Sequence, residues 1–404
     1  MHDDGPPGRR SLPGADAVPS GALLHEYLTA QAAEFLRRLP RLREEPAGLA
    51  AMLVTMRRID SCLTAFSALF DHLWAQGLRD ELDEMSAALS QEERTASRLG
   101  RLLQGLDRLS GTVPVGADQR HAGHPGHGSA AAGLDGVALV GEPVDSGGRG
   151  AWGERGGATA PLVPAARRSG RRAGTAPEPS QGGPVVGLAD HPGVPKARIL
   201  LTRRSGVTRE RAHTDSLRLM HSERFHALAD RMAMLTTDVP FTPAADLPAR
   251  SALLPLIAEA HRKLVAQVGL LPLGDAATPY NGQGLTPAHQ DADWRRTHLL
   301  AERCLDAAEA CRPAFGGSLA DLCRALGALT RLLELHRQAV DAAEAAALAA
   351  RAPRITPETA YALGVLHADQ RRDVERARYA FGLLWPDVAA ADWLHWEFPD
   401  ATRR

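Results

Sequence analysis

Apolar residues recur at helical intervals over most of the chain, and residues 49–71 show the pattern most clearly. Their apolar side chains follow one another at steps of three and four residues, the spacing that places them on one face of an α-helix. This stripe consists of Met52, Met56, Ile59, Leu63, Phe66 and Phe70. The pattern predicts a long core helix in which Arg57 and Arg58 lie at the edge of the apolar face.

The same periodicity predicts helices on both sides of this stretch. They cover residues 23–40, 77–89, 92–109, 199–220, 225–235, 251–268, 295–316 and 318–350, with a closing helix that begins at Thr356-Pro357. Pro313 is expected to end its helix before Phe315, because proline lacks the amide hydrogen that an inner helical turn needs. No strand pattern competes, so the sequence predicts an all-α protein.

Composition divides the chain into five segments. Residues 1–21 and 389–404 are predicted to be tails, residues 22–110 and 196–388 the two halves of a helical domain, and residues 111–195 an insertion. The insertion is rich in Gly and Pro and has few periodic apolar residues. We therefore expect the insertion and the N-terminal tail to be disordered.

Two features of the insertion could carry chemistry. The spacing of His121, His124 and His127 suits a zinc or copper ion, but the glycines around them would leave the geometry unheld, so no metal site is predicted. A small basic cluster could make a weak, salt-sensitive contact with phosphates, although solvated disorder is the preferred interpretation. This cluster consists of Arg167, Arg168, Arg171 and Arg172.

Charge and cysteine usage narrow the function classes. The formal net charge of −1 argues against binding a polyanion by bulk charge, so any such binding needs a local basic patch. Lysine occurs only at positions 196 and 263, and the abundance of Arg, Ala and Gly suggests a GC-rich genome. The four cysteines lack metal-type spacing and are interpreted as reduced core thiols. With no run of eighteen apolar residues and no signal segment, we expect a cytoplasmic protein.

A second stretch resembles the first. When Arg303 is aligned with Arg58, residues 295–316 also pair Ala310 with Ala65. The same alignment pairs Phe315 with Phe70. Few residues are identical, but both stretches are predicted to be helical with a basic residue at the same step.

These two stretches resemble the signature helix of the conserved histidine α-helical domain family, CHAD. That helix carries His at its start and basic residues three, seven, eight and ten positions later, once in each half of a duplicated bundle. The first copy keeps Arg57 and Arg58, has Ala50 at the His position, and has Leu53 and Asp60 at two basic positions. The helix framework is therefore similar, while the ligand face departs from the family.

The second copy departs in the same way. It keeps Arg303, has Arg295 at the His position and His298 at a basic position, and has Glu302 and Leu305 at two further basic positions. Other segments also resemble the family. They are LHEYLTAQAAEFLRRLPRLREEP near the start, SERFHALADRM in the middle and the closing helix YALGVLHADQRRDVERARYAFGLLW.

The resemblance implies a bundle of two pseudo-repeated antiparallel halves, without a cofactor, a metal or a catalytic centre. It also implies that basic residues along a channel between the halves bind inorganic polyphosphate, since guanidinium forks suit non-bridging phosphate oxygens. The candidates are Arg57, Arg58, Arg94, Arg203, Arg204, Arg262, Lys263, Arg295, Arg296, His298, Arg303, His336 and Arg337.

Three functions stay open from the sequence. The first is a polyphosphate-binding or granule-associated module whose partners include polyphosphate or a similar polyanion and polyphosphate-metabolising enzymes, with no membrane and no specific nucleic acid. The second is a divergent scaffold that has lost polyphosphate binding and binds a protein, favoured by the negative charges of Asp60 and Glu302. The third is an enzyme, for which the sequence offers no Walker loop, HExxH motif or nucleophile elbow.

Overall fold

A computed structural model describes residues 18–41, 46–111, 188–276, 288–315 and 317–389. Within these ranges the regular structure is helical, and the only bridges are two isolated ones, Pro19 with Pro248 and Phe70 with Phe241. The predicted all-α fold is thus confirmed. Most of the predicted tails and of the predicted insertion lies outside the described residues, although α1 already begins at Ser20.

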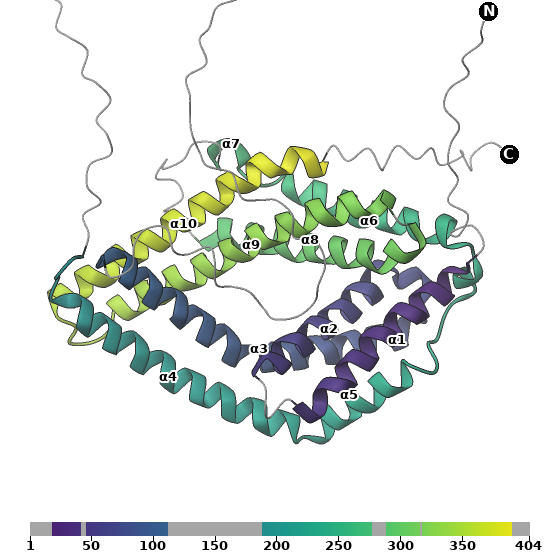
Figure 1. Cartoon of the computed structure of the whole chain (residues 1–404), viewed down its shortest axis with the longest axis horizontal. Helices are drawn as coiled ribbons and strands as arrows, with labels where there is room; N and C mark the ends of the chain where they lie inside the picture. The colour runs from purple at the N-terminus through teal and green to yellow at the C-terminus, as the bar shows by residue number, and fades with distance from the viewer. Residues whose placement is uncertain (1–17, 42–45, 112–187, 277–287, 316, 390–404) are drawn as a thin grey trace, which may run out of the picture. The chain divides into compact units, whose positions relative to one another are not determined.

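Ten α-helices are described, and Figure 1 shows how they are arranged. They are α1 (Ser20–Arg38), α2 (Pro46–Ala65), α3 (His72–Leu109), α4 (Gly193–Met220), α5 (Glu223–Met234), α6 (Ala249–Val268), α7 (Leu273–Ala276), α8 (Ala288–Phe315), α9 (Gly317–Ala350) and α10 (Pro357–Ala389). None of these helices is long and apolar enough to cross a membrane.

The core helix that the apolar stripe of residues 49–71 predicts corresponds to α2, and α2 is shorter than predicted. It ends at Ala65, yet Phe66 and Phe70, which follow it, are both buried. The backbone of Phe70 is extended and bridges Phe241, and the two rings stack with centroids 5.3 Å apart. Asp71 then caps α3, because its carboxylate accepts a hydrogen bond from the amide of Trp74. The predicted core positions are correct, but the turn into α3 ends the helix early.

Two other boundaries differ from the prediction. Residues 77–89 and 92–109 belong to one helix, α3, since neither Gly nor Pro interrupts them near Ser90. The expectation that Pro313 ends its helix is wrong, because α8 continues to Phe315. Phe315 is buried in the core. We attribute the continuation to this burial, which offsets the one backbone hydrogen bond that proline removes near the helix end.

The apolar side chains form two main cores. The larger one joins α1, α2, α5, α6 and α8 to the first halves of α3 and α9 and to the end of α10. The smaller one joins the end of α3 to the start of α4, the end of α9 and the start of α10. Helices from both sequence halves contribute to each core, so neither half forms a separate globule.

The chain leaves and rejoins the bundle at the smaller core. Residues 1–113 and 187–404 form one compact unit, and the amide of Leu188 donates to the carbonyl of Leu109 over 2.6 Å. Leu188 is buried, and α4 begins at Gly193, three residues before the predicted resumption at Lys196. The structured part of the second half therefore begins slightly earlier than residue 196.

Candidate functional site

The contact between α2 and α8 brings basic and acidic side chains together. Arg57 Nη1 lies 2.5 Å from Asp306 Oδ2, and Arg57 Nε lies 3.6 Å from Glu302 Oε1. Arg58 Nη2 lies 3.2 Å from Glu309 Oε2. The three acids follow one another at steps of four and three residues, so they share one face of α8. Two arginines predicted to bind an anion are therefore already paired with carboxylates of the chain.

Arg303, the basic residue retained in the second copy, is paired in the same way. Its Nη2 atom lies 3.5 Å from Asp60 Oδ2, while Arg79 Nε donates to Asp60 Oδ1 over 3.0 Å. Asp60 is buried, and it joins α2 to α3 and α8. The acid that departs from the family pattern thus holds two guanidinium groups in place.

His298 connects this contact to α9. Its ring nitrogens lie 3.8 Å from Glu302 and 4.0 Å from Glu334, and burial lowers the pKa of His298 despite these acids. The imidazole is therefore neutral at pH 7. Arg337 donates to Glu334 over 2.7 Å and to Asp341 over 2.8 Å. Although burial raises the pKa of Glu334, the hydrogen bond from Arg337 lowers it overall, so this carboxylate stays ionised.

We call these residues the α2–α8–α9 charge cluster, and we include in it Arg79 of α3, which pairs with Asp60. Its bases are Arg57, Arg58, Arg79, Arg303 and Arg337, and its acids are Asp60, Glu302, Asp306, Glu309, Glu334 and Asp341. Burial raises the pKa of Asp306 to about 6 even beside Arg57, so this carboxylate is still mostly ionised at pH 7. Five positive charges thus face six negative ones, an arrangement that does not attract a polyanion.

His336, another predicted ligand, lies in the interior under α10. Its ring stacks on Trp294 with centroids 5.2 Å apart, and its Nε2 atom accepts a hydrogen bond from Arg378 Nε over 3.1 Å. Asp291 in turn accepts from Arg378 over 2.6 Å and from Arg371 over 3.0 Å. Burial is the main reason why the pKa of His336 lies well below its usual value, and the positive charges of Arg378 and Arg371 lower this pKa further. His336 is thus a neutral, buried hydrogen-bond acceptor.

The remaining candidates lie outside the charge cluster. All are exposed: Arg94, Arg203, Arg204, Arg262, Lys263, Arg295 and Arg296. Arg262 and Lys263 pair with Glu259 on their own helix, α6, at 2.5 Å and 3.7 Å. Arg204 donates to the carbonyl of Leu348 over 3.2 Å. The structure therefore brings together fewer than half of the predicted residues.

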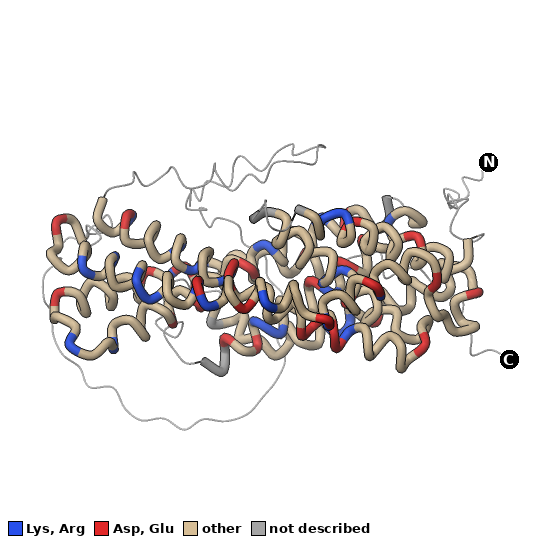
Figure 2. Tube along the Cα trace, turned by 90° about the horizontal axis from the view of Figure 1, so that it is seen from below, with Lys and Arg blue, Asp and Glu red and all other residues tan. Residues whose placement is uncertain are grey.

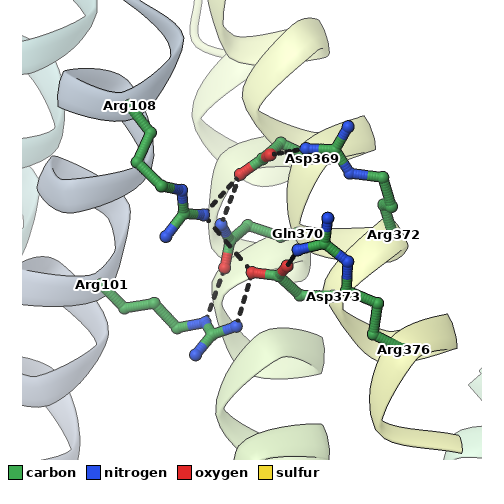
Figure 3. A network of polar contacts seen from close by, with 7 residues as sticks. All are labelled: Arg101, Arg108, Asp369, Gln370, Arg372, Asp373 and Arg376. Carbon is green, nitrogen blue, oxygen red and sulfur yellow. Dashed lines mark hydrogen bonds and ion pairs between the residues drawn. The ribbon is translucent and has the colours of Figure 1, made fainter. Parts of the chain in front are cut away.

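A second network joins α3 to α10 (Figure 3). Arg101 donates to Gln370 over 2.7 Å and to Asp373 over 2.9 Å. Arg108 donates to Asp369 over 2.8 Å and to Asp373 over 3.4 Å. Arg101 and Arg108 are separated by about two helical turns, so their side chains lie on the same face of α3, the face that contacts α10.

Two further arginines of α10 complete this α3–α10 network. Arg372 Nη2 lies 2.7 Å from Asp369 Oδ1, and Arg376 Nη1 lies 3.3 Å from Asp373 Oδ1. The side chain of Asp369 is 3% exposed, whereas those of Arg372 and Arg376 are 33% and 61% exposed. Figure 3 shows the guanidinium groups of Arg101, Arg108, Arg372 and Arg376 around the carboxylates of Asp369 and Asp373. Among these drawn residues the positive charges outnumber the negative ones, and Arg376 is the most exposed of the four arginines.

Comparison with known proteins decides the family. The family model described as CHAD domain matches residues 26–349. The chain belongs to the CHAD family. A solved structure, PptA from Streptomyces chartreusis, is similar to this CHAD chain, with a TM-score of 0.63 and 35% sequence identity over 91% of this chain and 100% of PptA. No protein of curated function matches the chain.

The CHAD match ends at residue 349, so α10 lies beyond it. Arg372 and Arg376 of α10, and Arg101 and Arg108 of α3, are not among the residues that the sequence predicts to bind an anion. A signal was present in the sequence, because QRRDVERAR places four arginines within eight residues of the closing helix. Figure 2 shows the basic and acidic positions of the described helices interleaved through the middle of the view.

Proposed function

We propose that this CHAD protein is a non-catalytic module that binds inorganic polyphosphate or a similar linear polyanion through the α3–α10 network. The observation that carries the proposal is the excess of arginines over carboxylates among the drawn residues of this network, where the exposed Arg376 and the partly exposed Arg372 lie beside carboxylates already shared with Arg101 and Arg108. Forked guanidinium donors suit phosphate oxygens, and a linear polyanion gains from several modest contacts.

The position of Arg372 supports the same proposal. Its Nε–H is buried and has no hydrogen-bond acceptor among the residues that the structure describes, while its Nη2 atom donates to Asp369. An unpaired donor of this kind is costly in the free protein, and an incoming phosphate oxygen could satisfy it after a small side-chain movement. We infer that Arg372 and Arg376 make the first contacts with the polyanion.

The α2–α8–α9 charge cluster is assigned a structural role in this proposal. Arg57 and Arg58 pair with carboxylates of α8, so a phosphate would have to displace acids that the fold holds beside them. The net charge of this cluster also disfavours an anion. Polyphosphate-metabolising enzymes and polyphosphate granules in the cytoplasm remain the proposed partners and location.

Binding to long-chain polyphosphate tests the proposal directly. The full chain should bind labelled polyphosphate at low salt, and its affinity should fall steeply as salt rises, because binding releases counterions from the polyanion. Arg372→Ala/Arg376→Ala should weaken binding, whereas Arg262→Ala/Lys263→Ala, which removes the same charge from α6, should not. Equal effects of the two pairs would contradict the assignment to α10.

The paired arginines of α2 support a second candidate function. Because Arg57 and Arg58 are held by Asp306 and Glu309, the chain can also be a CHAD scaffold that has lost polyphosphate binding and binds a protein. Absence of polyphosphate binding at low salt, with a folded protein, would favour this candidate over the first.

A further inference from the structure

A cavity of about 240 Å³ lies where α3, α4 and α9 meet, next to the smaller core. Its apolar lining is aliphatic and consists of Leu102, Leu201, Ala345, Leu348 and Ala349. This volume corresponds to about eight water molecules, at about 30 Å³ for each. The volume and the lining of this cavity therefore suit a small aliphatic group.

The charged residues around this cavity are separated by sign. Arg98 on α3 and Arg204 on α4 supply the basic side, while Asp341 and Glu344 on α9 supply the acidic side. The hydroxyls of Ser205 and Thr208 lie on the α4 wall. A ligand in this cavity thus meets positive charge from one pair of helices and negative charge from the opposite helix.

Two of these charges have no partner within the described part of the chain. Arg204 donates to the Leu348 carbonyl, and Asp341 accepts from Arg337. In contrast, neither Arg98 nor Glu344 makes a hydrogen bond or ion pair with another described residue. One base and one acid without a partner among the described residues therefore border the same aliphatic cavity, the half-buried Arg98 and the solvent-exposed Glu344.

We propose that this cavity binds a small zwitterion with an aliphatic body, namely an aliphatic α-amino acid of about the size of leucine. Its carboxylate pairs with Arg98, with Arg204 close by, and its ammonium group pairs with Glu344 beside Asp341. Its side chain packs on Leu102, Leu201 and Leu348. Because each ionised group on the α-carbon meets an opposite charge, both groups gain charge-assisted hydrogen bonds.

The acids of the cavity separate this site from the polyanion site of the proposed function. Asp341 and Glu344 repel phosphate, so polyphosphate does not suit this cavity, and the α3–α10 network involves none of its residues. A fatty acid or simple amine leaves one of the two free charges unpaired. The inference is therefore independent of whether polyphosphate binds.

Calorimetric titration of the full chain with L-leucine tests the proposal. L-Leucine should bind saturably, while 4-methylpentanoate, which lacks the ammonium group, and 3-methylbutylamine, which lacks the carboxylate, should each bind about tenfold or more weakly. Glycine, which lacks the aliphatic body, should bind weakly too. No saturable binding of L-leucine at millimolar concentration, or equal binding of the two analogues, would overturn the proposal.

Two variants test which residue binds the ammonium group of the ligand and which binds its carboxylate. Glu344→Gln should reduce the preference for L-leucine over 4-methylpentanoate, and Arg98→Gln should reduce the preference over 3-methylbutylamine. Arg203→Gln, an exposed neighbour on α4 that does not line the cavity, serves as the matched control and should leave both preferences unchanged. An unchanged preference in Glu344→Gln, with the thermal transition retained, would contradict the assigned orientation.

Discussion

Arg57 and Asp306 lie 2.5 Å apart across the contact between α2 and α8 and join two segments separated by 249 positions. A guanidinium group that the CHAD resemblance assigns to an external polyanion is therefore held by an internal carboxylate. Removing Arg57 would leave the buried Asp306 carboxylate without its partner, which lowers the stability of the bundle. The acids of α8 thus stabilise the bundle and at the same time occupy donors that a phosphate would need.

Removing two of these acids should restore anion binding at this contact. Glu302→Gln/Glu309→Gln changes the α2–α8–α9 charge cluster from five bases and six acids to five bases and four acids. We expect tighter polyphosphate binding with a steeper salt dependence. The measurement is a binding isotherm at several salt concentrations. The control is Glu259→Gln/Asp321→Asn, which removes two exposed acids elsewhere, and an equal gain in that variant would contradict the expectation.

The core position of Phe66 gives a stability prediction. Its side chain is fully buried in the larger core, so Phe66→Ala should lower the free energy of unfolding by about 3–5 kcal/mol, as for other buried Phe truncations. Chemical denaturation of both proteins measures this difference. Leu73, which is exposed on α3, supplies the control, and Leu73→Ala should change the stability by less than about 0.5 kcal/mol.

The insertion should be dispensable for stability. Leu109 and Leu188 are joined by a backbone hydrogen bond, so a short linker can close the gap between them. Because the sequence of the insertion has few periodic apolar residues, replacing residues 113–186 by a Gly/Ser linker should leave the thermal transition nearly unchanged. A large fall in the transition temperature would show that the insertion packs on the bundle.

Burial of His336 predicts an acid-dependent loss of stability. The folded-state pKa of His336 lies well below its usual value of about 6.5, so the unfolded chain binds the proton more readily. The stability from this residue is therefore present above about pH 6.5 and is lost as the pH falls below it. Urea unfolding at pH 7.5 and 5.5 should show a smaller loss in His336→Gln than in the parent chain, because glutamine can still accept the bond from Arg378 but does not titrate.

His226, which is exposed on α5, provides the control for this pH effect. His226→Gln should keep the full loss of stability between the two pH values. His298 and His261 also have lowered pKa values because they are buried, so His336→Gln should remove only part of the dependence. An unchanged dependence in His336→Gln would mean that His336 is accessible to solvent.

Apolar spacing was sufficient to predict the all-α fold and the core positions, because helical periodicity is a local property of the sequence. It placed Ile59, Leu63 and Phe66 in the core, where the structure has them. The same local rules misplaced the ends of two helices. Phe70 lies outside α2 and forms an isolated bridge with Phe241, and α8 continues beyond Pro313 to the buried Phe315. Both boundaries depend on contacts with residues that are distant in the chain or on burial.

The candidate site was harder to predict for the same reason. A basic residue at a family position shows where a charge lies along a helix, but it does not show which acid faces it from another helix. Arg58 and Glu309 are 251 positions apart, and Arg101 and Asp373 are 272 apart. Only the packing of the helices reveals that Arg58 is neutralised and that the arginines of α10 form a network with excess positive charge.

The salt dependence of polyphosphate affinity in two charge-matched variants tests the central claim most directly. Arg372→Ala/Arg376→Ala removes one partly exposed and one exposed base of the α3–α10 network, and Arg57→Ala/Arg58→Ala removes two bases paired with the acids of α8. Both proteins should be confirmed as folded by their thermal transitions. We predict that the α10 variant loses affinity and shows a shallower salt dependence, while the α2 variant stays close to the parent chain. The opposite order would contradict the account and return the polyanion site to the contact between α2 and α8.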